Sequence, residues 1–134
     1  MKYQFYQCVG NRMRILSRLV DAQFRVFLKE YDITENQLTI LFFLDAVKSV
    51  DQGKIGKKLV LERSTVSRNI RLLEKNGLVK KSSDYRPIIT PTLSGIKLVK
   101  ELRPKWENIM DNLSGQLGQN GIHALETLEE KLKI

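Results

Sequence analysis

Three hydroxyl and two guanidinium side chains lie within eight residues in the middle of the chain. They are Ser64, Thr65, Ser67, Arg68 and Arg71. If Val66 and Ile70 of the same segment face a core, helical spacing turns these five side chains outward. Hydroxyl and guanidinium groups suit phosphate oxygens and the base edges of a DNA major groove. The segment therefore predicts a surface that binds nucleic acid.

The positive charge of the chain gathers around the same segment. The sequence has 23 Lys and Arg against 15 Asp and Glu, a formal net charge of +8. Residues 53–86 hold ten of these basic and three of the acidic residues, a local net charge of +7, whereas the remainder carries +1. Such clustering indicates a surface that meets an anion. Lys57 and Lys58 in this segment are further candidates for phosphate contacts.

The spacing of apolar residues predicts a mainly helical chain with one β-hairpin. Steps of three and four predict helices over about 8–31, 34–48 and 62 or 64–76, a short helix near 55–61, and a long helix from 92. Gly77 supplies a left-handed stop. Strands over 78–82 and 87–90 flank a polar turn that ends at Arg86, and Pro87 with Pro91 predict that the second strand lies at a sheet edge.

Several residues predict where these helices begin, end or bend. Thr34 and Gln37 fit a capping box, and Thr92 is a candidate N-cap. Pro104 predicts a kink or a boundary in the long helix. The glycines at 115, 118 and 121 are expected to end it before a last helix over 122–132. In the 62–76 helix, the predicted buried side includes Leu72.

Length and composition exclude several classes of protein. A chain of 134 residues with 42% apolar and 28% charged residues fits one compact domain, or one domain with an oligomerisation arm. Its longest apolar stretch, residues 38–44, is too short for a membrane span, and one cysteine forms no internal disulfide. We expect a cytoplasmic protein. One Cys and one His do not make a metal cluster, and no catalytic motif or cofactor site is expected.

Two helices joined by a tight turn and followed by a hairpin form a winged helix-turn-helix, which coincides here with the basic segment. The hairpin tip would place Arg86 beside the duplex, where a narrow minor groove attracts a guanidinium group. The first predicted helix has a second apolar row beside its main one, at Ile15, Leu19, Ala22 and Val26. One neighbour would not cover so wide an arc, so this helix is expected to pack on more than its own domain.

The run from Ser64 to Val79 resembles the recognition helix and first wing strand of MarR-family winged-helix regulators. Asp84 and Arg86 match the family's Asp-x-Arg wing motif, and Thr92 with Gly95 match its Thr-x-x-Gly. The resemblance implies a homodimeric transcriptional regulator of double-stranded DNA, most simply a repressor relieved by a small aromatic effector. It divides the chain into a dimerisation helix (1–33), a winged helix-turn-helix (34–92) and dimerisation helices (93–134).

Other interpretations stay open at this point. Arg68 and Arg71 could belong to a solvated helix face with local ion pairs, and Arg86 could pair with Asp84 to shape its turn. Cys8 could be an inert thiol, or the sensor of a repressor that peroxide releases from DNA, as the resemblance suggests. The winged fold could also serve as a protein-interaction module that does not bind DNA.

Overall fold

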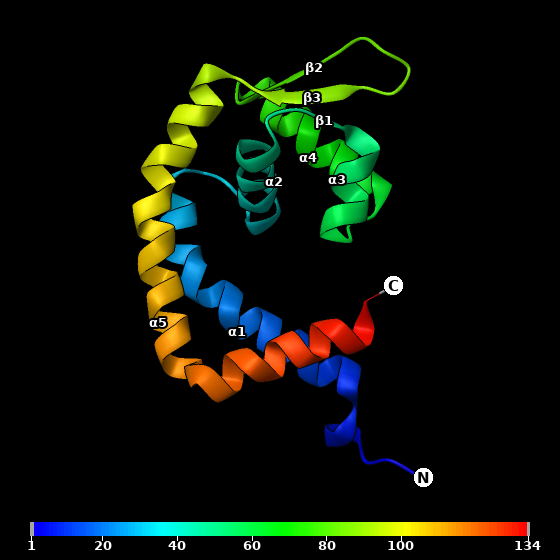
Figure 1. Cartoon of the computed structure of the whole chain (residues 1–134), viewed down its shortest axis with the longest axis vertical. Helices are drawn as coiled ribbons and strands as arrows, with labels where there is room; N and C mark the ends of the chain where they lie inside the picture. The colour runs from blue at the N-terminus through cyan, green and yellow to red at the C-terminus, as the bar shows by residue number, and fades with distance from the viewer. Residues whose placement is uncertain (1, 134) are drawn as a thin grey trace. The chain divides into compact units, whose positions relative to one another are not determined.

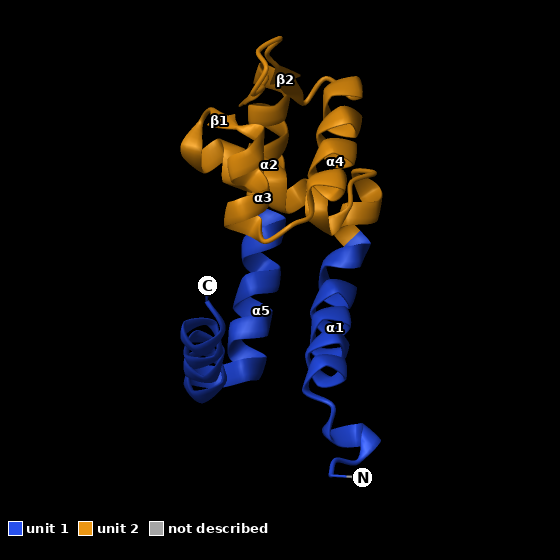
Figure 2. Cartoon of the chain, turned by 90° about the vertical axis from the view of Figure 1, so that its right-hand side faces the viewer, with its two compact units in different colours: residues 1–26, 104–134 blue, residues 27–103 orange. Residues whose placement is uncertain are grey.

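The computed structural model describes residues 2–133 (Figure 1). Its elements are the 3-10 helix η1 (Phe5–Gln7), helices α1 (Val9–Glu30) and α2 (Glu35–Val47), strand β1 (Val50–Asp51), helices α3 (Gln52–Leu59) and α4 (Arg63–Lys75), strands β2 (Val79–Lys81) and β3 (Ile88–Pro91), and helix α5 (Leu93–Leu132). They form unit 1 (Met1–Val26 with Pro104–Ile134) and unit 2 (Phe27–Arg103), coloured in Figure 2. The predicted fold class, mainly α with a small β wing, is confirmed.

Unit 2 contains nearly the whole apolar core. Helices α2, α3 and α4, the small sheet and the first part of α5 contribute its completely buried side chains, which are Ile40, Leu41, Leu44, Ile55, Ile70, Leu73, Ile89 and Leu102. Helix α2 begins as predicted: Thr34 Oγ1 accepts the Gln37 N–H at 3.2 Å, and Gln37 Oε1 accepts the Thr34 N–H at 3.1 Å. This capping box satisfies two backbone donors at the start of the most buried helix.

The sheet has three strands in the order β1-β3-β2, so the prediction that the second hairpin strand lies at an edge is wrong. Val50 and Asp51, which lie between two of the predicted helices, pair with β3 on its other side. The prolines fit because β1 is only two residues long and does not reach Pro91. On the side of β2, Pro91 is opposite Val79. Hydrogen-bonded and non-hydrogen-bonded pairs alternate in an antiparallel ladder, and Thr92 bonds to Leu78 in the next pair, so Pro91 and Val79 form a non-hydrogen-bonded pair. The missing N–H of Pro91 therefore removes no bond to β2.

Helix α4 ends as predicted at Gly77, whose φ of 74° is in the left-handed region. Its buried residues are Val66, Asn69, Ile70 and Leu73. Leu72 was expected beside them but is 39% exposed. One residue advances a helix by about 100°, which carries Leu72 away from the buried stripe that Leu73 belongs to.

The start of α5 is bonded to the base of the wing. Thr92 donates its N–H to the Leu78 carbonyl at 3.1 Å, and its hydroxyl donates to the Gly77 carbonyl at 2.6 Å. The same hydroxyl accepts the Gly95 N–H at 3.1 Å, which confirms Thr92 as the N-cap. We call this set of three hydrogen bonds the wing latch.

Helix α5 is interrupted at Gly118, whereas Pro104 lies within the helix and marks the predicted boundary, since unit 2 ends at Arg103 and unit 1 resumes at Pro104. Gly118 has φ 69° and ψ 177°, whereas no other residue inside α5 leaves helical geometry among those described. This combination of φ and ψ is nearly exclusive to glycine. Of the three glycines expected to end the long helix, Gly118 is the one that breaks it.

Unit 1 leaves most of its large apolar side chains exposed. Leu113 is its one buried apolar residue within the described chain, whereas exposed ones occur along both of its helical segments. On α1 they include Val9, Ile15, Leu16, Leu19 and Val26, and on the end of α5 they include Leu117, Leu125, Leu128 and Leu132. Within residues 2–133, no helix combines the length and apolar character that crossing a membrane requires.

Candidate nucleic-acid interface

The outward face of α4 is polar and basic. With Val66, Ile70 and Leu73 buried, the helical wheel places Ser64, Arg68, Arg71 and Lys75 at the centre of the opposite side. All four are exposed. Three of them, Ser64, Arg68 and Arg71, are predicted contact residues, and α4 brings them onto one surface.

The two remaining predicted residues of α4 lie on opposite flanks of this face. Ser67 is exposed and lies on the flank that faces α3 and the wing, where it lines a hollow. Thr65 lies on the other flank and is half-buried, and its carbonyl accepts a hydrogen bond from the Asn69 side chain at 2.9 Å. Of these two side chains, only Ser67 faces the hollow.

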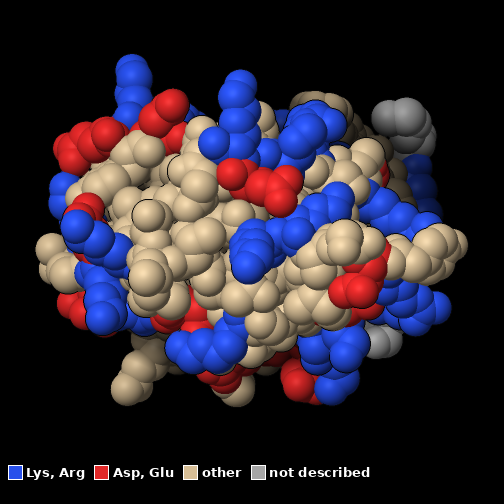
Figure 3. Space-filling model, turned by 90° about the horizontal axis from the view of Figure 1, so that it is seen from above, with Lys and Arg blue, Asp and Glu red and all other residues tan. Residues whose placement is uncertain are grey.

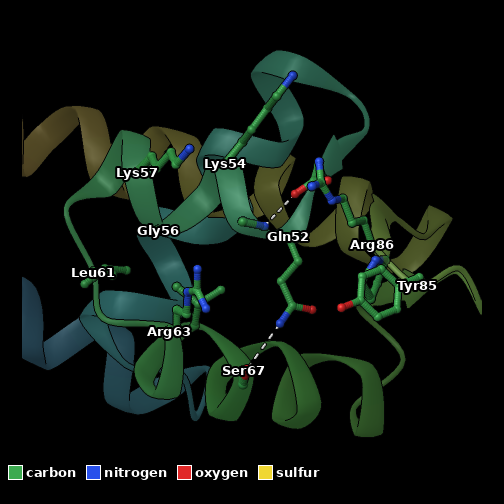
Figure 4. A pocket seen from close by; sticks show the side chains of 13 residues that line it. Gln52, Lys54, Gly56, Lys57, Leu61, Arg63, Ser67, Tyr85 and Arg86 are labelled. Carbon is green, nitrogen blue, oxygen red and sulfur yellow. Dashed lines mark hydrogen bonds between the residues drawn. The ribbon is translucent and has the colours of Figure 1, made fainter.

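The hollow, of about 830 Å³, is bounded by α3, the start of α4 and the wing. Four cationic side chains line it: Lys54 and Lys57 from α3, Arg63 from α4 and Arg86 from the wing (Figure 4). Lys58, one residue beyond Lys57, is exposed but does not line it. The fold thus brings the predicted residues Lys57, Ser67 and Arg86 together around one concave, basic surface.

A residue that the sequence pattern did not single out lies at the centre of this hollow. Gln52, the first residue of α3, donates its side-chain N–H to Ser67 Oγ at 3.2 Å (Figure 4). Its N-terminal neighbour Asp51 caps α3 by accepting the Gly53 N–H at 2.7 Å. No periodicity or motif indicates that residues 15 positions apart meet, so only the fold reveals the contact.

The basic residues of the segment are free to meet an external anion. All ten Lys and Arg side chains from residues 53 to 86 are exposed, and none forms an ion pair with any described residue. The alternative ion pairs of Arg71 with Glu74 and of Arg86 with Asp84 are therefore not made in this structure. Figure 3 looks onto the end of the molecule that carries the wing, where Lys and Arg side chains are spread with acidic ones between them.

Tyr85, at the wing tip, is completely exposed and also lines the hollow beside Arg86 (Figure 4).

Cys8 does not belong to this interface. It lies in unit 1, near the N-terminus, as an exposed thiol immediately before α1. Its sulfur accepts the Asn11 N–H at 3.4 Å, so this side chain caps the first turn of α1.

The comparisons with known proteins agree with this geometry. Residues 31–86 match the model of the MarR family. The structure of Bordetella bronchiseptica BpsR, a protein whose DNA binding is regulated by 6-hydroxynicotinic acid, is similar over 97% of this chain and 96% of its own, with 25% identity and a TM-score of 0.86. Staphylococcus aureus MepR in complex with DNA is similar over 92% of this chain and 95% of its own, with 27% identity and a TM-score of 0.80.

A third structure, a mutant of Escherichia coli MarR in complex with operator DNA, shares the fold at 16% identity and a TM-score of 0.82, covering 96% of each chain. No curated protein shows a significant sequence match. The matched segment contains α2, β1, α3, α4, β2 and the wing turn through Arg86, and it includes every residue that lines the basic hollow except Pro87. The chain has the winged-helix fold of these transcriptional regulators, and its residues 31–86 match the MarR family.

Proposed function

We propose that this protein represses transcription by binding a specific double-stranded DNA site as a homodimer, and that a small aromatic effector releases it. The observation that carries DNA binding is the set of exposed, unpaired cations around α4 and the wing. A duplex is a dense array of phosphate charges, and cations that have no acidic partner in the protein gain most from meeting it.

The residues divide into three roles. Helix α4 enters the major groove, and Arg68 and Arg71 donate to base edges there with Ser64 and Thr65 beside them. Lys57 and Lys58, at the end of α3, and Ser67 contact the flanking backbone or base edges. Arg86 lies at the exposed wing tip, where an adjacent minor groove attracts its guanidinium group.

The proposal of a homodimer rests on the incomplete core of unit 1. A 22-residue helix is only marginally stable without tertiary packing, yet α1 leaves Leu16 and Leu19 60% and 61% exposed. The end of α5 is similarly uncovered at Leu125 and Leu128. A second copy would bury both stripes by symmetry and would hold two α4 helices at a fixed spacing.

The proposal of an effector rests on the relative that is regulated by 6-hydroxynicotinic acid. An effector weakens DNA binding only if it binds better to a dimer whose α4 helices have the wrong spacing. In that state one half-site loses its contacts. The ligand of the present protein is expected to be a small aromatic compound of this kind.

Selection of bound duplexes from a random pool by the purified protein tests this function. We expect enrichment of a pseudo-palindromic site whose half-sites are about one DNA turn apart. Sedimentation velocity at micromolar concentration is expected to show a dimer. A monomer that enriches no sequence and does not bind heparin at low salt would favour the protein-interaction module instead.

A second candidate function is favoured by one observation, the exposed Cys8 thiol at the positive end of the α1 dipole. In that case peroxide would oxidise the sulfur and release the protein from DNA. Adding peroxide to the protein-DNA complex and to the complex of Cys8→Ser separates the two functions. Release that requires Cys8 supports the sensor, whereas equal retention of both proteins supports an effector-controlled repressor.

A further inference from the structure

The contact between Gln52 and Ser67 joins the start of α3 to the flank of α4 that faces the hollow. Gln52 Nε2 donates to Ser67 Oγ at 3.2 Å, which occupies one acceptor site of the hydroxyl. Ser67 donates its own proton to no described residue, and its side chain is exposed. The hydroxyl proton is therefore available to an acceptor outside the protein.

The carbonyl oxygen of the Gln52 side-chain amide has no hydrogen-bond donor within the described part of the chain. This atom, Oε1, is buried, and no donor among residues 2–133 reaches it. Proteins seldom retain a buried polar atom without a hydrogen bond unless the group serves another purpose. Among the described residues, the amide is thus held only by its bond to Ser67, and this bond decides whether the Ser67 hydroxyl donates or accepts towards the hollow.

We propose that Gln52 is a positioning residue for DNA recognition, because it makes the Ser67 hydroxyl a hydrogen-bond donor towards DNA. The acceptor is a phosphate oxygen or an acceptor atom of a base edge, such as guanine O6 or N7. This inference rests on the proposed DNA-binding function and adds to it a residue from outside the recognition helix.

The substitution Gln52→Glu tests the direction of the hydrogen bond. A carboxylate has nearly the same shape as the amide but only accepts, so Ser67 would turn its proton inward and lose its donor towards DNA. The new negative charge also repels phosphates, and this effect must be separated from the loss of the donor. Measuring the same substitution in a Ser67→Ala background removes the donor and keeps the charge, so the difference between backgrounds isolates the coupling.

The probe is the duplex selected by the wild-type protein, with affinity measured by fluorescence anisotropy at one fixed salt concentration. We expect Gln52→Glu to weaken binding about tenfold more in the wild-type background than in Ser67→Ala. A Ser64→Ala background is the matched control, since Ser64 lies on the same helix and forms no bond with Gln52. There the loss should equal that in the wild-type background.

Gln52→Asn is the second variant, because it keeps an uncharged amide but is one methylene too short to reach Ser67. It should also lower affinity only where Ser67 is present, while the melting temperature falls by no more than the loss of one hydrogen bond explains. Equal losses in all backgrounds, or no loss for Gln52→Glu, would overturn the inference while DNA binding stands. A wild-type protein that binds no duplex would overturn the proposed function as well.

Base substitutions in the selected duplex identify the acceptor. If Ser67 meets a base, Ser67→Ala abolishes the preference at one position of each half-site. If it meets a phosphate, Ser67→Ala weakens binding equally for all sequences. Either pattern supports a donor at this place, whereas full affinity and specificity in Ser67→Ala would contradict it.

Discussion

The substitution Gly95→Ala should disrupt the wing latch. A Cβ atom at this position would overlap the carbonyl oxygen of Leu78 and lie 3.2 Å from its carbonyl carbon. Both are backbone atoms, so no side-chain rotation relieves the clash. The start of α5 must instead move away from the wing, which strains the hydrogen bond from Thr92 to the same carbonyl.

The size of the effect follows from two contributions. Forcing a methyl group into a filled space costs about 1–3 kcal/mol, and losing one or two latch hydrogen bonds adds about 1 kcal/mol each. Alanine returns about 1 kcal/mol through its helix propensity. The free energy of unfolding should therefore fall by about 1–4 kcal/mol, which lowers the melting temperature of a domain of this size by roughly 4–20 °C.

Thermal unfolding followed by circular dichroism measures this change. Gly115→Ala in the same helix is the control, because a Cβ there meets no atom within 4 Å. It should raise stability by up to about 1 kcal/mol. If Gly95→Ala melts at the same temperature as Gly115→Ala, the close approach of α5 to the wing is not a feature of the folded protein.

Three further predictions concern binding, assembly and strain. Arg68→Ala should weaken binding to the selected duplex by about 1–3 kcal/mol per contact in a gel-shift titration, and unchanged affinity would remove Arg68 from the interface. Leu16→Asp should place a charge in the proposed dimer contact and give a monomer by sedimentation velocity, whereas a persistent dimer would mean that α1 is not in that contact. Val60 is 83% exposed and has a φ of 54°, a left-handed conformation that strains a β-branched residue. Val60→Gly should therefore raise the free energy of unfolding by about 1 kcal/mol in urea titrations, whereas a lower free energy of unfolding would show that the backbone at Val60 is not strained.

Local signals allowed much of the fold to be predicted. The pair Thr34 and Gln37 marked the start of α2, and Gly77 marked the end of α4, because caps and left-handed stops depend on residues close in sequence. The basic side chains of α4 were also found correctly as an exposed face. Which side chains share this face follows from helical periodicity alone.

Features that depend on distant residues were missed. Strand β1 has two residues, too few for any alternation, and it exists because Val50 and Asp51 pair with residues almost forty positions away. The hydrogen bond from Gln52 to Ser67 joins two elements whose relative placement only the folded core defines. The sequence also did not indicate which of the glycines at 115, 118 and 121 breaks α5, since any glycine can adopt a left-handed conformation.

The most direct test of DNA recognition compares the affinity of the purified protein for the selected duplex and for a scrambled duplex of the same composition, between about 50 and 200 mM salt. The account predicts that the selected duplex binds at least about 10³-fold more tightly. It also predicts that the affinity for either duplex falls with salt at a log-log slope of about 0.9 per neutralised phosphate. Equal, weak and salt-independent binding of both duplexes would contradict it.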